Sequence, residues 1–178
     1  MKIINTKFIG LKIIKQDVYK DRRGYLRVTH DQKKNKKKNF VFEYCTTSKK
    51  NSLRGFHFQY KHQQAKYVSV IKGEILDCVI DLRRNSKTFG QTFKIILSDK
   101  NNLGLYIPEG FAHAYYSCKN ENIIYYKLNN YYQPKYENGI NPLDKKLKIK
   151  WPGKIFLVST KDKKLGSLDD FKIKYKYL

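Results

Sequence analysis

Cysteine is scarce in this sequence, and the few cysteines follow no pattern that would bind a metal or form disulfides. The chain of 178 residues has three, Cys45, Cys78 and Cys118, an odd number at wide spacing. Zinc sites and disulfide frameworks need closely or evenly paired cysteines. The sequence therefore excludes a small disulfide-stabilised module and predicts reduced thiols in a cytoplasmic protein.

Long apolar segments are missing as well. Residues 1–11 mix lysine, asparagine and threonine with their apolar residues, so they contain no signal-peptide core. No run elsewhere in the sequence is long enough to span a bilayer. We therefore expect a protein that has no membrane partner.

Acidic residues are few, because 15 aspartates and glutamates stand against 38 lysines and arginines, a formal net charge of +23. Such an excess is typical of proteins that neutralise the phosphates of nucleic acids. Here the lysines are scattered along the whole chain, and the densest run, residues 33–38, is typical of a solvated loop. We expect no specific nucleic-acid partner, although the positive field would attract an anionic small molecule.

Aromatic residues are abundant, with 15 Tyr and 10 Phe, and many lie in short segments of strand character. These segments are separated by turn-forming residues and span 25–29, 40–46, 67–72, 75–82, 92–97, 103–107 and 123–128. Helical periodicity is absent before the polar tail that follows Ser167. The pattern predicts an all-β, antiparallel fold, best matched by a jelly roll. We expect one domain over residues 1–178, with its core at about 8–130 and a C-terminal extension at about 131–178.

A histidine stands within the strand-like segment 52–59, Ser-Leu-Arg-Gly-Phe-His-Phe-Gln. Alternation along a strand puts His57 and Gln59 on one face and the two phenylalanines on the other. A histidine that faces a barrel interior can act as a general base near neutral pH, and a nearby lysine such as Lys66 can stabilise an enolate oxygen. The same pattern fits a structural histidine and a surface lysine.

A second histidine, His113, follows a tight turn that contains Pro108 and Gly110. Cupins use such a turn to present a metal-binding histidine. The first motif, however, has His57-x-Gln59 in place of two histidines, and no glutamate follows at the spacing that completes a metal cage. The sequence therefore predicts no metal site.

Five segments resemble, in the same order, the dTDP-4-dehydrorhamnose 3,5-epimerases: residues 21–25, 53–59, 81–90, 107–113 and 151–152. The resemblance runs from about residue 8 to residue 162. It implies a cupin jelly roll without metal or cofactor, forming a homodimer, that inverts C3 and C5 of a nucleoside-diphosphate 4-keto-6-deoxy sugar. A ketone at C4 acidifies the hydrogens on both neighbouring carbons, so one base and one acid on opposite faces suffice.

The resemblance also implies roles for individual residues. His57 would be the base and Asp162 its dyad partner, while Lys66 would hold the C4 oxygen and Tyr126 would be the acid. The substrate-binding residues would be Arg23, which reaches the pocket of a partner subunit, together with Arg54, Gln59, His113 and Tyr132.

Ordinary structural roles remain open for several of these residues. Tyr126 could be an aromatic core residue, Asp162 an exposed carboxylate of the tail, and the two arginines members of surface ion pairs. Asp81 is expected to pair with Arg83 or Arg84 rather than to serve the pocket.

One stretch departs from the family pattern. The family reads its nucleotide with Gln-x-Asn-x-Ser on the strand before the histidine motif, and this chain has Phe42, Tyr44 and Thr46 at those places. With this change the sequence does not specify which nucleotide carries the sugar, and GDP is an alternative to dTDP. Three other functions also remain: a C3-only epimerase of a GDP-linked 4-keto sugar, a 3,4-ketoisomerase, and a non-catalytic cupin that binds sugars or polyanions.

Overall fold

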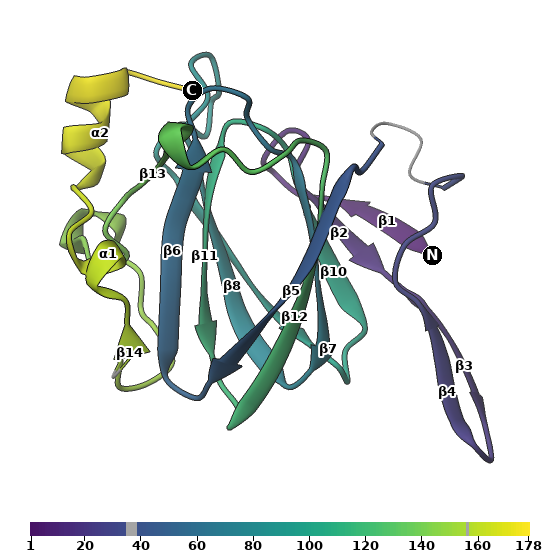
Figure 1. The fold of residues 1–178 in the computed structure, drawn as a ribbon. Helices are drawn as coiled ribbons and strands as arrows, with labels where there is room; N and C mark the ends of the chain where they lie inside the picture. The colour runs from purple at the N-terminus through teal and green to yellow at the C-terminus, as the bar shows by residue number, and fades with distance from the viewer. Residues whose placement is uncertain (35–38, 156) are drawn as a thin grey trace.

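The computed structural model describes residues 1–34, 39–155 and 157–178. Two β-sheets pack face to face and enclose the interior of the molecule (Figure 1). The last four residues of the lysine-rich run 33–38, predicted to be a solvated loop, lie outside the described part.

The first sheet has six strands, with β1 (Lys2–Asn5) and β5 (Phe42–Lys49) at its edges. Its order is β1, β2 (Lys12–Lys15), β10 (Leu103–Ile107), β7 (Lys66–Lys72), β12 (Glu121–Leu128) and β5. The second sheet has the order β13 (Glu137–Gly139), β6 (Ser52–Gln59), β11 (Phe111–Ser117), β8 (Glu74–Asp81) and β9 (Thr92–Ser98), and β14 (Leu157–Val158) pairs with β6.

Antiparallel pairing dominates, which confirms the predicted all-β fold. Each strand segment predicted from the sequence overlaps a strand of the structure. The pairing of β14 with β6 is parallel and departs from the prediction. β14 has only two residues and reaches β6 from a distant part of the chain, so no local sequence pattern predicts this pairing.

The interior between the sheets is filled by alternate residues of the facing strands. On β8, Val79 points inward while Cys78 and Ile80 belong to a second apolar cluster on the outer side of the sheet. Every residue of β11 is buried. The second sheet is therefore covered on both faces, which explains why its central strands β6, β11 and β8 are buried along most of their length.

The C-terminal segment provides the outer cover of the second sheet. It contains η1 (Pro134–Tyr136), η2 (Lys145–Leu147), α1 (Thr160–Lys163) and α2 (Leu168–Tyr175), and both α-helices lie outside β6 (Figure 1). Leu168 and Phe171 of α2 pack into the outer apolar cluster. Ser167 caps α2 in a capping box with Asp170, so the helix begins where the sequence predicted one.

A β-hairpin extends away from the sandwich. Its strands are β3 (Asp17–Asp21) and β4 (Gly24–Val28), and they pair only with each other in the described sheets (Figure 1). No helix in the described part of the chain is both long and apolar enough to cross a membrane.

Candidate active site

A glycine in β6 decides how the residues of this strand face the interior. Gly55 has a φ of +109°, and a Cβ at this position would lie 2.4 Å from the backbone oxygen of His113. The pairing of β6 with β11 shifts register here, with His57 opposite His113 but Arg54 opposite Tyr115. This irregularity brings Arg54 and His57, three residues apart, to the lining of the same groove.

His57 and Asp162 form a hydrogen-bonded pair. The Nε2 of His57 lies 2.7 Å from Asp162 Oδ1, and Asp162 Oδ2 accepts from the backbone N–H of Gly55 at 3.2 Å. Burial raises the pKa of Asp162, but the hydrogen bonds from His57 and Gly55 outweigh it, so the net pKa lies below its usual value. An ionised Asp162 requires a proton on Nε2 and leaves Nδ1 of His57 with a free lone pair.

Asp162 is 2% exposed, so its alternative interpretation as an exposed carboxylate of the tail is wrong. Ser159 caps α1, and its Oγ accepts from the backbone N–H of Asp162 at 3.0 Å. The short helix α1 therefore turns the aspartate back toward β6.

A small cavity of about 90 Å³ lies beside His57, between the two sheets. Lys66, the first residue of β7, shares this cavity with His57. Burial lowers the pKa of Lys66 to about 8, although the carboxylates of Glu137 and Asp77 act in the opposite direction. The cavity is lined by Tyr44, His57, Phe58, Gln59, Gln64, Lys66, Tyr132 and Glu137.

Tyr126 contacts this lining from β12. Its ring stacks on Tyr44, with centroids 4.8 Å apart, and meets the ring of His113 edge to face at 6.0 Å. Tyr126 is 4% exposed and belongs to the apolar cluster between the two sheets. Burial, and to a lesser degree the neighbouring phenols, hold its pKa well above the usual value, so the hydroxyl keeps its proton at any physiological pH.

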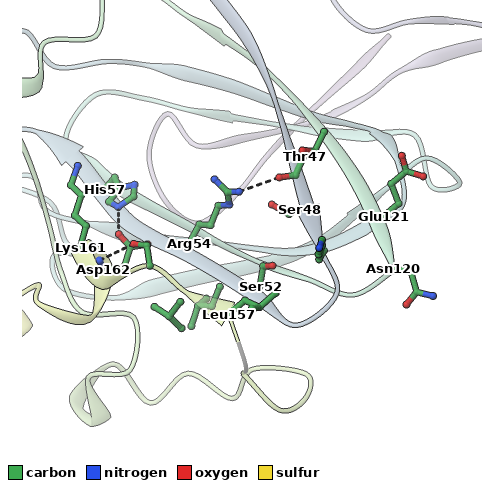
Figure 2. A pocket seen from close by; sticks show the side chains of 14 residues that line it. Thr47, Ser48, Ser52, Arg54, His57, Asn120, Glu121, Leu157, Lys161 and Asp162 are labelled. Carbon is green, nitrogen blue, oxygen red and sulfur yellow. Dashed lines mark hydrogen bonds and ion pairs between the residues drawn. The ribbon is translucent and has the colours of Figure 1, made fainter.

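A larger groove of about 900 Å³ also has His57 in its lining. Figure 2 shows His57, Asp162 and Lys161 at one end of this groove and Arg54 near its middle. The Arg54 guanidinium donates to the backbone oxygen of Thr47 at 3.1 Å and makes no ion pair within the described residues. Within the described residues its remaining N–H groups are free to meet an anion, as is the ammonium group of Lys49, whereas Lys161 in the same lining is paired with Glu137.

His113 lies behind His57, on the neighbouring strand. Its Nε2 lies 2.8 Å from Asp77 Oδ2, and both residues are almost fully buried. The other carboxylate oxygen of Asp77 has no hydrogen-bond partner among the described residues. This pair makes the wall next to the base polar.

The remaining predicted substrate residues lie in different environments. Gln59 accepts from the backbone N–H of Gln133 and donates to the backbone oxygen of His62, both at 2.7 Å, so it ties two loops to the cavity. The Tyr132 hydroxyl donates to Glu137 at 2.6 Å.

Arg23 lies at the turn of the hairpin, with its side chain 91% exposed and paired with Asp21. The fold therefore does not bring Arg23 into the site of its own chain. Asp81, by contrast, pairs with Arg83 at 2.7 Å, which confirms the structural role predicted for it.

Two residues of the site were missed by the sequence analysis as contributors to the cavity. Glu137 Oε1 lies 4.0 Å from His57 Nδ1, and Glu137 also pairs with Lys161. Tyr44 lines the cavity although it was considered only as a departure from the nucleotide-reading pattern. Glu137 reaches His57 because β13 pairs with β6, and a three-residue strand in a loop has no sequence pattern that would have revealed it.

Known proteins resemble this chain in sequence and in fold. Residues 5–170 match the family model described as dTDP-4-dehydrorhamnose 3,5-epimerase. Among curated proteins, the dTDP-4-dehydrorhamnose 3,5-epimerase of Methanothermobacter thermautotrophicus is 38% identical over 169 residues, 91% of each chain. The enzyme of the same name from Shigella flexneri is 36% identical and covers 91% of this chain and 93% of its own.

Among solved structures, dTDP-6-deoxy-D-glucose-3,5-epimerase from Legionella pneumophila superimposes with a TM-score of 0.90 and is 38% identical, covering 94% of this chain and 93% of its own. That structure is a complex with dTDP-4-keto-L-rhamnose. Since the family model and these full-length relatives cover the strands that carry His57, Lys66 and Tyr126, the chain belongs to the dTDP-4-dehydrorhamnose 3,5-epimerase family of isomerases.

Proposed function

We propose that this chain inverts the configuration at C3 and C5 of a 4-keto-6-deoxyhexose carried on dTDP. The observation that carries the proposal is the joint lining of one cavity by His57, held by Asp162, and Lys66. A base beside an ammonium group is what proton removal next to a ketone requires.

The first step removes a proton from a carbon next to the C4 ketone. Nδ1 of His57 is the base, because Nε2 is engaged by Asp162. As the imidazole takes up the proton, the carboxylate of Asp162 stabilises the positive charge. The electrons of the broken C–H bond move to the C4 oxygen and form an enolate.

Lys66 stabilises this enolate with its ammonium group, in surroundings where a charge interaction is stronger than in water. Tyr126 then delivers its phenolic proton to the carbon and re-forms the C4 ketone; afterwards Tyr126 regains a proton from solvent and His57 releases to solvent the proton that it took up. His57 belongs to the second sheet and Tyr126 to the first. A sugar ring held between the sheets would therefore lose its proton on one face and gain it on the other, which inverts the centre. The same sequence at the other carbon inverts the second centre.

The nucleoside diphosphate would occupy the larger groove. Arg54, Lys49 and Lys161 offer cationic groups to the two phosphates there. The Legionella relative was solved with a dTDP-linked sugar, which supports dTDP as the carrier.

We also infer a homodimer that works in the cytoplasm. The hairpin carries three exposed apolar residues, Tyr19, Tyr25 and Leu26, at 63%, 55% and 61% exposure, and a second copy would bury them. Arg23 at its turn would then be available to the partner's substrate. The three cysteines are free thiols, which supports a reducing compartment.

Proton NMR in heavy water tests the proposal. The protein is incubated with the 4-keto-6-deoxyglucose derivative of dTDP and, separately, of GDP. We expect deuterium to enter at C3 and C5 of the dTDP sugar with inversion of both centres. His57→Ala should abolish this exchange, because the enolate cannot form without the base.

His62→Asn serves as the matched control, since His62 is exposed and asparagine tolerates its positive φ. It should exchange at the wild-type rate. Exchange at C3 alone would reduce the function to a single-centre epimerase, and exchange only with the GDP sugar would change the carrier. No exchange with either sugar in a folded protein would refute the proposal.

A further inference from the structure

Tyr44 occupies a place where the family pattern has a small amide. It lies on β5, directly opposite Tyr126 on β12 in the register of the two strands. The rings stack with centroids 4.8 Å apart and an interplanar angle of 19°. Directly opposed residues on one sheet face pack closely, and an asparagine at position 44 would cover far less of the Tyr126 ring.

Among the described residues, the Tyr126 hydroxyl is held in place only by the contacts of its ring. In the described part of the chain it makes no hydrogen bond, and the electrostatic influences on it come from neighbouring groups without direct bonding. Within the described part, the ring's other aromatic contact is with His113, whose ring centroid lies 6.0 Å away in a T-shaped arrangement. The position of the hydroxyl therefore depends on packing, and Tyr44 supplies the stacked face.

The hydroxyl of Tyr44 also makes no hydrogen bond to a described residue, and burial raises the pKa of Tyr44 to about 12. The phenol is thus neutral and unattached. These two facts point to the ring of Tyr44, rather than its polar group, as the part that matters to Tyr126.

We propose that Tyr44 is a positioning residue that holds the Tyr126 ring by stacking, so that the Tyr126 hydroxyl is fixed where it can protonate the enolate. The inference rests on the proposed function, because it assigns to Tyr126 the proton that causes inversion. It adds a determinant that the family pattern does not contain.

The enolate can be protonated in two ways, and the two products distinguish the action of His57 from that of Tyr126. If His57 returns a proton to the carbon from which it took one, the centre keeps its configuration. Because the side chain of His57 is 30% exposed, its proton exchanges with heavy water, and the returned atom is deuterium. If Tyr126 delivers the atom from the opposite face, the centre is inverted. The ratio of inversion to exchange with retention therefore measures how well Tyr126 is positioned.

The experiment compares Tyr44→Asn with Tyr44→Phe in heavy water on the dTDP-linked 4-keto sugar. In Tyr44→Asn we expect inversion to fall about 10- to 100-fold, the cost of displacing a catalytic group by roughly an ångström. Exchange with retention should continue at the wild-type rate, because His57, Asp162 and Lys66 are untouched. In Tyr44→Phe the stacked ring remains, so inversion should be retained.

Tyr177→Asn is the matched control, because Tyr177 has nearly the same exposure, 38% against 37%, and lies outside the site. Loss of inversion in Tyr44→Phe would overturn the proposal and make the Tyr44 hydroxyl a proton donor. An equal fall of exchange and inversion in Tyr44→Asn would also overturn it, since general damage to the site would have that effect.

A second measurement does not depend on turnover. The flip rate of the Tyr126 ring, measured by NMR with labelled tyrosine, should rise in Tyr44→Asn and stay unchanged in Tyr44→Phe. An unchanged rate in Tyr44→Asn would overturn the stacking role. If the wild type exchanges no deuterium at all, the proposed function is what fails, and the ring measurement still decides whether Tyr44 restrains Tyr126.

Discussion

Lys66 brings an ammonium group into a cavity where it has no hydrogen-bond or ion-pair partner among the described residues. Burial disfavours the charged form and lowers the pKa to about 8, and the nearby carboxylates of Glu137 and Asp77 limit the shift. A lysine in this state is poised to gain a strong interaction when an enolate oxygen appears beside it. The energetic disadvantage in the free enzyme becomes an advantage in the transition state.

The depressed pKa of Lys66 predicts an alkaline limit to activity. Below pH 8 the ammonium is charged and can hold the enolate; above about pH 8 it loses its proton, and kcat/KM should fall. In Lys66→Arg the cation stays charged at all these values, so the fall should move to higher pH. Profiles of kcat/KM between pH 6 and 10 measure this fall in the wild type and in Lys66→Arg. The control is Lys72→Arg, at an exposed lysine of the same strand. An unchanged alkaline limb in Lys66→Arg would contradict the assignment.

Strand β6 illustrates where alternation predicts a site and where it fails. Alternation correctly put His57 and Gln59 on the cavity side, and both line the cavity. The same rule would put Arg54, three residues before His57, on the opposite face. The register shift at Gly55 brings Arg54 back to the groove, and such irregularities re-aim side chains next to active sites.

Gly55→Ala should therefore disrupt both stability and activity. The added Cβ would meet the backbone of His113 and Ala114 at 2.4 to 2.7 Å, on a residue whose φ is +109°. We expect a loss of about 3 kcal/mol in the free energy of unfolding. Gly24→Ala is the control, with a φ of +139° but nothing within 4 Å, and it should cost about 1 kcal/mol. Urea denaturation measures both, and equal losses would mean that the packing against His113 is unimportant.

The molecule as a whole combines a closed sandwich with a hairpin that stands apart from it. The sandwich buries apolar side chains between its two sheets and, on the outside of the second sheet, under the C-terminal segment. The hairpin does neither, because Tyr19, Tyr25 and Leu26 remain exposed. An apolar hairpin left open in this way is typical of an interface.

We expect Tyr25→Ser combined with Leu26→Ser to dissociate the proposed homodimer without unfolding the sandwich. Light scattering after gel filtration should give twice the 21.2 kDa of one chain for the wild type and a monomer for the double variant. The control is Ile173→Ser on α2, which removes an equally apolar residue that is 82% exposed. The dimer proposal fails if the wild type is already monomeric or if the double variant remains dimeric.

The strand content, the family and the placement of His57 and Lys66 in one site could be predicted from the sequence, because these depend on local patterns. Apolar alternation reports which face of a strand is buried, and the histidine motif is a contiguous segment. The order of the strands in the two sheets cannot be predicted from any local sequence pattern. The parallel pairing of β14 with β6 cannot be predicted in this way either.

Contacts between distant segments were decided only by the tertiary structure. The resemblance named Asp162 as the partner of His57, but only the fold brings the two together across 105 positions of the chain, and Glu137 approaches the same imidazole through a three-residue strand. The stack of Tyr44 on Tyr126 depends on the register of β5 and β12. The sequence alone specifies which chemical groups are available, whereas their distances depend on how the sheets pair and pack, a collective property that no single segment contains.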